Sequence, residues 1–238
     1  MSSQHTVIIG GTSGIGLATA QALLAAGGQV TVTGRSEARL AHARRVLGPQ
    51  AQVRQMDAAA ADALPAQFAA IGAFDHLVLA LGSGRGLGPL ADVDLADVRL
   101  GFEEKVFAHF AAAKAALPHL DRAGSLTFIS AVSAHAAAPG TAGIGAANAA
   151  VAALVPILAV ELAPVRVNAV SPGVIDTPWW DVMPEAQKQA IFEQYAAKTP
   201  VGRVGTAEDV AGAIAFLIGN GFVNGQVLTC DGGLRLAA

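Results

Sequence analysis

Three glycines near the N-terminus have the clearest chemical meaning in this sequence. Gly10, Gly14 and Gly16 stand between an apolar run and a helical pattern in "VIIGGTSGIGLATA". Glycines permit a tight turn and a close approach of the backbone to a phosphate, and the start of a helix offers free N–H groups and a favourable dipole. The spacing predicts a cradle for the diphosphate of a dinucleotide, although a Gly-rich turn can also be purely structural.

The elements that must position this turn alternate along the whole chain. Short apolar runs predict strands at 5–11, 29–34, 51–57, 74–82, 124–130, 165–173 and 225–233. Helical patterns between them predict helices at 14–28, 36–47, 61–72, 95–120, 140–164, 184–197 and 206–219. Strict alternation of strands and helices predicts an α/β fold with a doubly wound parallel sheet and helices on both faces.

Composition narrows the class of protein. The 238 residues suffice for one domain with a large core. A net charge of −3 without a basic cluster argues against nucleic acid as a partner. The single cysteine, Cys230, excludes an internal disulfide and fits a reducing compartment. The six histidines lack the paired spacing of metal ligands, so we expect no metal.

We expect neither a membrane span nor an exported protein. No run of about 18 apolar residues is free of polar breaks. The N-terminus, "MSSQHTVIIGG", lacks the basic region, apolar core and cleavage site of a secretory signal. A cytoplasmic protein is therefore expected.

Five ordered matches resemble the short-chain dehydrogenase/reductase family over the whole chain. They are the G-x-x-x-G-x-G turn, "FDHLVLALG", "VRVNAVSPGVIDTP", "RVGTAEDVAGAIAFLI" and "GQVLTCDGG". The resemblance implies a Rossmann-type sheet of about seven strands in the order 3-2-1-4-5-6-7. It also implies one domain over residues 1–238, with a small substrate lid at about 176–204.

The end of the second strand indicates which dinucleotide the resemblance implies. A member that prefers NAD usually has an acidic residue here, bonded to the ribose hydroxyls, whereas this chain has Gly34 and Arg35. A guanidinium suits a 2′-phosphate, so we expect NADP(H), with Ser36 as a further donor. Arg35 can instead be a solvated surface charge. Asp57 resembles the family's adenine-contacting aspartate, and a helix N-cap is the alternative.

Further residues match the family's cofactor contacts. Around the turn and after the fourth strand these are Thr12, Ser13, Ile15 and Gly82. Pro172, Gly173, Val174 and Thr177 match the loop that holds the nicotinamide carboxamide.

The family's four catalytic positions carry other residue types. Ile144 stands where the family has the proton-donating tyrosine, Asn148 where it has the lysine, Ala131 where it has the serine, and Lys105 where it has the helix asparagine. The chain's only tyrosine, Tyr195, lies in the lid with no lysine four or seven residues later. A general acid contributes about 10²–10⁴ to the rate, so the common mechanism is not expected to operate.

Lys105 and Asn148 look exchanged relative to the family, because each residue type has moved to the other helix. Our hypothesis is that the Lys105 ammonium fills the vacated space and bonds the nicotinamide-ribose hydroxyls and Asn148. The alternative is that Lys105 points to solvent.

Other polar residues near the site are weaker candidates. Ser133 and His135 follow the fifth strand, where the family lines its substrate pocket, and His135 could donate a proton. His109, one turn after Lys105, is expected to pack on a helix that the family uses for dimer contact. Arg85 could hold an anionic substrate or be solvated.

Trp179 and Trp180 predict an apolar cover over the nicotinamide, or simple packing of the lid on the core.

Three functions follow from this pattern. The chain could be an NADPH-dependent oxidoreductase of non-standard mechanism, an inactive NADP(H)-binding sensor or partner subunit, or a lyase or cyclase that runs no redox step. Fold alone does not separate these functions. For each we expect a small, apolar ligand and a homodimer or homotetramer formed through the two long helices.

Overall fold

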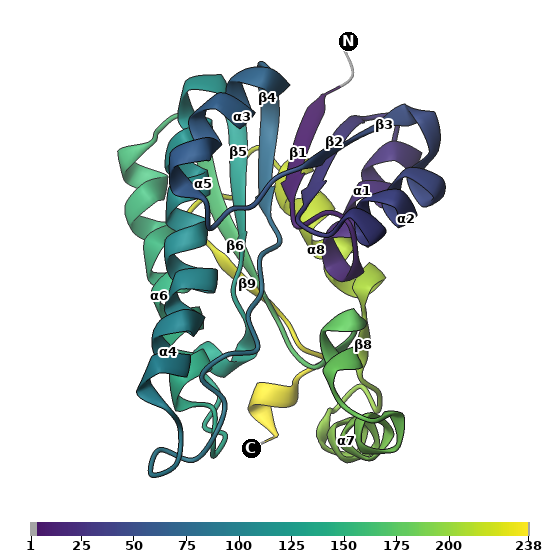
Figure 1. Ribbon diagram of the computed structural model, residues 1–238, viewed down its shortest axis with the longest axis vertical. Coiled ribbons are helices and arrows are strands. Elements are labelled where there is room, and N and C mark those ends of the chain that lie inside the picture. Colours follow the sequence, from purple (N-terminus) through teal and green to yellow (C-terminus); the bar gives the residue numbers. More distant parts are fainter. Residues whose placement is uncertain (1–3, 238) are drawn as a thin grey trace.

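A seven-stranded parallel sheet forms the centre of the fold (Figure 1). The computed structural model describes residues 4–237. The strands lie in the order β3-β2-β1-β4-β5-β6-β9, which confirms the predicted α/β class and strand order. Their bounds are β1 (His5–Ile9), β2 (Gln29–Gly34), β3 (Ala51–Gln55), β4 (Phe74–Leu79), β5 (Leu120–Ile129), β6 (Arg166–Pro172) and β9 (Val227–Cys230).

Helices cover both faces of this sheet (Figure 1). One layer holds α1 (Gly14–Ala25), α2 (Glu37–Leu47) and α8 (Ala207–Gly219). The other holds α3 (Leu64–Ile71), α4 (Leu95–Phe102), α5 (Ala108–Ala116) and α6 (Ala142–Glu161). Ile8 of β1 joins Ile214 in one core cluster, whereas its neighbour Val7 joins Val151 in the other. Strands buried on both faces explain why the strand sequences are almost continuously apolar.

The helix predicted over 95–120 is interrupted. A π-helical segment, η3 (Glu103–Phe107), separates α4 from α5, and β5 already begins at Leu120. A π turn adds a residue to the turn and shifts the face presented by the helix that follows. Lys105, in the middle of η3, is buried.

By length and composition alone, α6 could cross a membrane, which the sequence prediction did not allow for. Its mean hydropathy is 2.0 over 18 residues. In the fold, however, Val151, Val155 and Ala159 of α6 pack into the core against the sheet. Packing against the sheet accounts for the apolar residues on this face of the helix, while Ile157 and Val160 on the same helix are exposed.

The segment expected to form a lid leaves the main sheet after β6. It holds a short helix, η6 (Pro178–Val182), and α7 (Glu185–Lys198). Two further short strands, β7 (Ile175–Asp176) and β8 (Gly205–Thr206), pair in parallel at its base, and the sequence did not predict them. Figure 1 shows α7 standing beyond one end of the main sheet.

Candidate functional site

The Gly-rich turn is bonded to β2 and leads directly into α1. The N–H groups of Gly10 and Gly11 donate to the Thr33 carbonyl oxygen at 3.1 and 3.0 Å. Gly10 has a φ of +80°, and a Cβ there would collide with the Ala80 carbonyl group. A Cβ at Gly16 would collide with the Gly10 carbonyl group. The turn therefore requires glycine, and the first N–H groups of α1, which have no partner within the helix, suit an anionic group.

The other predicted residues of the turn lie around the start of α1. Thr12 is buried. Ser13 is the N-cap residue, and its hydroxyl makes no capping hydrogen bond. Ile15 packs at the edge of the core. The Ser13 hydroxyl is thus not used to cap α1.

The carboxyl end of β2 has no room for the carboxylate of an NAD-preferring site. A Cβ on Gly34 would lie 2.5 Å from Thr12 Oγ1. Arg35 is exposed, and within residues 4–237 its guanidinium has no hydrogen-bond or ion-pair partner, while Gln55 Nε2 donates to its carbonyl oxygen at 3.3 Å. Ser36 begins α2 without a side-chain capping bond. The Arg35 guanidinium and the Ser36 hydroxyl are therefore both available to bind a ligand at the end of β2.

Asp57 closes a turn and does not cap a helix. Its Oδ1 accepts the Ala59 N–H at 3.0 Å, and the next helical segment begins at Ala61 with Ala60 as its N-cap. The helix-cap alternative is therefore wrong. The geometry places Asp57 after β3, beside the end of β2.

The loop after β6 meets the Gly-rich turn. Thr177 Cβ would lie 3.3 Å from a Cβ on Gly14. The Gly173 N–H donates to the Cys230 carbonyl oxygen at 3.0 Å, and Val174 accepts the Gly205 N–H at 2.9 Å. These bonds, together with Pro172 at the end of β6, hold the loop against the start of α1. Two predicted halves of one dinucleotide site are thus side by side.

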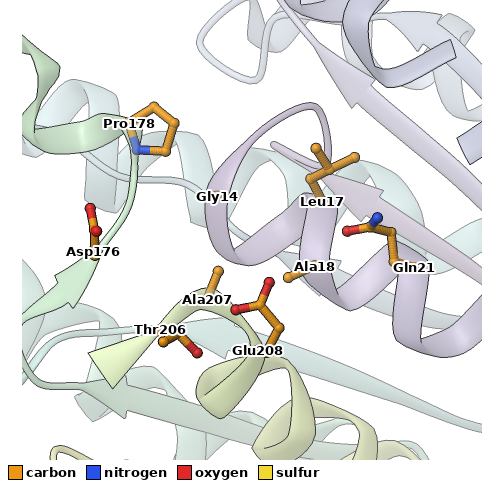
Figure 2. A pocket seen from close by; sticks show the side chains of 9 residues that line it. All are labelled: Gly14, Leu17, Ala18, Gln21, Asp176, Pro178, Thr206, Ala207 and Glu208. Carbon is orange, nitrogen blue, oxygen red and sulfur yellow. The ribbon is translucent and has the colours of Figure 1, made fainter. Parts of the chain in front are cut away.

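An open groove of about 360 Å³ lies behind this meeting point (Figure 2). Its lining comes from α1, from the loop after β6 and from the start of α8: Gly14, Leu17, Ala18, Gln21, Asp176, Pro178, Thr206, Ala207 and Glu208. Two carboxylates face it, those of Asp176 and Glu208 (Figure 2). The Asp176 carboxylate is paired with the Lys188 ammonium at 3.0 Å. Because Gly14 of the Gly-rich turn lines the groove, the groove adjoins the predicted dinucleotide site.

Lys105 is bonded to the ends of two central strands. Its Nζ donates to the carbonyl oxygens of Leu81 and Ile129, each at 2.7 Å, and the residue is 5% exposed. The alternative that Lys105 points to solvent is therefore wrong, and so is the expected hydrogen bond to Asn148. The expected contact with the nicotinamide ribose stays a prediction. Burial lowers the pKa of Lys105 to about 7.

His109 packs inside the fold, as expected. Its ring stacks on Phe128 with centroids 5.8 Å apart. Nδ1 lies 2.6 Å from the Lys105 carbonyl oxygen, and Nε2 lies 3.1 Å from that of Leu79. Burial and then the neighbouring Lys105 charge lower the pKa of His109 to about 3. His109 is consequently neutral at physiological pH.

Asn148 and Ser133 form a second polar pair at the same edge of the sheet. Asn148 Nδ2 donates to Ser133 Oγ at 3.1 Å. Asn148 Oδ1 is buried and has no hydrogen-bond partner among the described residues. Ser130 Oγ donates to the Asn148 carbonyl oxygen at 2.9 Å. A buried acceptor without a partner costs about 1–3 kcal/mol, so this amide oxygen suits a ligand hydroxyl.

Apolar side chains complete this edge. Ile144 lies one turn before Asn148 on α6, and Ala131 precedes the short helix η5 (Val132–Ala134), which packs on α6. Neither side chain has a hydroxyl or an ionisable proton. The structure thus brings together the elements that carry Lys105, Ala131, Ile144 and Asn148.

Trp179 reaches from the lid to the loop after β4. Its ring atoms lie 4.0 Å from a Cβ on Gly82 and 3.7 Å from one on Gly84. Trp180 supports it at a centroid distance of 4.7 Å and donates from Nε1 to the Ile175 carbonyl oxygen at 2.9 Å. The indole of Trp179 therefore covers the loop that contains Gly82.

The remaining candidates are held elsewhere or exposed. Arg85 forms an ion pair of 3.1 Å with Asp97 on α4, which ties its guanidinium to the protein surface. His135 is exposed, and its ring makes no hydrogen bond within the described residues. Sequence reasoning missed Ser83, whose hydroxyl donates to Glu104 at 2.7 Å. Nothing in the local sequence indicates this pair, because the two residues lie on different elements.

Known proteins match the chain over nearly its full length. A family model described as enoyl-(acyl carrier protein) reductase matches residues 10–235. The cis-4-hydroxycyclohexanecarboxylate dehydrogenase of Sinomonas cyclohexanicum is 34% identical over 239 residues, which cover 95% of this chain and 94% of that protein. A small-chain dehydrogenase solved in complex with NADPH has a TM-score of 0.84 and 31% identity, covering 99% of this chain and 100% of that one. ElxO with NADP bound has a TM-score of 0.88 and 27% identity, covering 98% of each chain.

Proposed function

The chain belongs to the short-chain dehydrogenase/reductase family of oxidoreductases, and from that premise we propose that it binds NADP(H) and transfers hydride with a non-standard active site. The observation that carries the proposal is the meeting of Thr177 with the Gly-rich turn at Gly14. It joins the cradle for the diphosphate to the loop expected to hold the nicotinamide.

The residues at both ends of this site fit NADP(H). Arg35 is free to pair with a 2′-phosphate, and Gly34 offers no carboxylate to repel it. At the other end, the unpartnered Asn148 Oδ1 can accept a hydroxyl of the nicotinamide ribose. The small-chain dehydrogenase and ElxO, which hold NADPH and NADP in their structures, support the same choice.

The chain's own residues can orient a substrate without a tyrosine. When bound, NADPH supplies the hydride. Asn148 Nδ2 donates to Ser133 Oγ, which leaves the Ser133 hydroxyl proton free to hydrogen-bond a substrate oxygen. An oriented donor of this kind contributes about 10²–10³ to the rate. Ile144 and Ala131 have no proton to give, so the proton must come from water, from the substrate or from another side chain, with Lys105, Ser133 and His135 as the candidates. We therefore expect slow reduction of simple ketones.

Substrates are proposed to be small and apolar. Ile144, Ala131 and the indole of Trp179 offer apolar surface around this edge of the sheet. The relative named for cis-4-hydroxycyclohexanecarboxylate favours ring alcohols and ring ketones as the first compounds to test.

A second candidate function is NADP(H) binding without turnover, as a sensor or partner subunit. The apolar side chains of Ile144 and Ala131 favour it, because they remove both donors of the common reaction.

One experiment separates these functions. NADPH absorbance and product formation are followed together with a panel of ring ketones, enones and the corresponding alcohols. Consumption of one NADPH per product supports the oxidoreductase. Binding of NADPH by calorimetry without consumption supports the sensor, whereas product at constant absorbance indicates a lyase or cyclase. Absence of NADPH binding contradicts the proposal.

We also propose that the chain forms a homodimer or homotetramer through α5, α6 and the adjoining η3. Large apolar side chains are exposed on these segments: Phe107, Phe110, Ile157 and Val160. Surface of this kind commonly marks an interface between proteins. Light scattering of the purified chain should give a multiple of 23.9 kDa, and a monomeric mass contradicts this part of the proposal.

A further inference from the structure

Lys105 is a buried cation at the carboxyl ends of the two strands that flank the nicotinamide half of the proposed site. Its two hydrogen bonds of 2.7 Å have the short length typical of an ionised donor. One acceptor, Leu81, immediately precedes Gly82, and the other, Ile129, ends β5. Crevices outside the carboxyl ends of such strands hold the ligand in open α/β sheets.

No opposite charge neutralises this ammonium among residues 4–237. None of the ion pairs among these residues includes Lys105. The neighbouring Glu104 carboxylate accepts the Ser83 hydroxyl at 2.7 Å and lies outside ion-pair distance of the ammonium. On the same helix His109 is neutral, and Glu103 is exposed. The only charged residue of α6 is Glu161 at its far end, and η5 has none beyond the exposed His135 that follows it. The positive charge of Lys105 therefore acts on a ligand bound at the carboxyl ends of β4 and β5.

The two forms of the cofactor differ in charge at the ring. Oxidised nicotinamide carries a positive charge, whereas the reduced ring is neutral. A fixed cation in a poorly solvated site repels the first and leaves the second unaffected. We propose that the Lys105 ammonium makes this site bind NADPH more tightly than NADP⁺, so that occupancy of the site follows the redox state of the cofactor pool. The inference rests on the proposed NADP(H) binding.

The preference must depend on pH. Because burial lowers the pKa of Lys105 to about 7, the ammonium is present below that pH and is lost above it. The preference for NADPH is therefore full in mild acid and fades in alkali. By linkage, NADP⁺ binding near neutral pH must lower the pKa of Lys105 further and so release more protons than NADPH binding does.

The test compares dissociation constants of NADPH and NADP⁺ by calorimetry at about pH 6 and about pH 9. The 2′-phosphate is common to both forms, so its titration cancels in the ratio of the two constants. We expect the ratio Kd(NADP⁺)/Kd(NADPH) to be about tenfold larger at the lower pH, within the usual range of coupling between sites. Lys105→Met should make this ratio independent of pH. Lys114→Met, at an exposed lysine of the same helical run, should behave as the wild type.

Each other outcome overturns the inference. A ratio that does not change with pH in the wild type, or changes equally in Lys105→Met, removes Lys105 from the effect. If Lys105→Met does not fold, the wild type alone decides. Proton release, measured in two buffers of different ionisation enthalpy, must be larger for NADP⁺ than for NADPH, because the contribution of the 2′-phosphate is common to both. Equal release by both nucleotides contradicts the inference while leaving NADP(H) binding intact. Binding of neither nucleotide overturns the proposed function as well.

Discussion

Replacing Arg35 by alanine tests the cofactor assignment most directly. The Arg35 side chain is exposed, and no other side chain within residues 4–237 engages its guanidinium, so the substitution should leave stability nearly unchanged. A charge-assisted hydrogen bond contributes about 1.5–3 kcal/mol, and exposure to solvent moves the expectation to the lower end of that range. We therefore expect NADPH to bind about tenfold more weakly, which corresponds to roughly 1.4 kcal/mol.

NADH serves as the control ligand for this prediction. NADH has no 2′-phosphate, so its affinity should be the same in Arg35→Ala and the wild type. Arg45→Ala, at an exposed residue near the other end of α2, should change neither affinity. The assay is calorimetric titration with both nucleotides, and added salt should shrink the Arg35 effect. Equal loss of NADPH and NADH affinity, or no loss of either, would refute the pairing of Arg35 with the 2′-phosphate.

Four further predictions address the turn, the core, the substrate edge and the buried lysine. Gly16→Ala places a Cβ against a backbone carbonyl group, so it should abolish NADPH binding and lower the melting temperature; unchanged binding by calorimetry would contradict the close-approach argument. Arg166 donates to three carbonyl groups at and just beyond the end of α8, so Arg166→Met should lower the free energy of unfolding in urea by about 2–3 kcal/mol, whereas the exposed Arg122→Met should change it little. Ser133→Ala should reduce any turnover about tenfold or more while leaving the NADPH dissociation constant within about twofold of the wild type; an unchanged rate removes Ser133 from the reaction. The pKa of Lys105 falls from 10.5 to about 7 on folding, so the unfolded chain binds more protons in that window and the stability of the wild type should rise with pH there relative to Lys105→Met; parallel denaturation curves of the two proteins at every pH would contradict a buried, titrating lysine.

Local patterns were sufficient for the scaffold and for the glycine turn between the first strand and the first helix. The glycines at 10, 14 and 16 could be interpreted without tertiary information, because the turn they form joins two consecutive elements. The absence of an acidic residue at Gly34 and Arg35, where an NAD-preferring relative is expected to have one, could be seen for the same reason, because both residues lie at the end of one strand. The elements that surround them follow from periodicity, which depends only on near neighbours.

Local sequence patterns could not predict which partners the polar side chains near the catalytic positions would have. Lys105 finds its partners 24 residues away in both directions, at Leu81 and Ile129. The π-helical segment in which Lys105 lies has no signature in "GFEEKVF". The expected bond between Lys105 and Asn148 was wrong: the Lys105 ammonium donates to the two carbonyl oxygens, and the Asn148 amide donates to Ser133.

The sequence by itself determined a parallel α/β sheet and a glycine turn after its first strand, and it led us to predict a non-standard set of residues at the four catalytic positions. Only the tertiary structure decided that Lys105 is buried without a counter-charge, that Asn148 retains a free acceptor, and that Trp179 covers the loop at Gly82. The physical reason is that strand order in a parallel sheet brings together residues distant in the chain. Which carbonyl oxygen or ring a side chain meets there depends on several elements at once, and no short stretch of sequence records it.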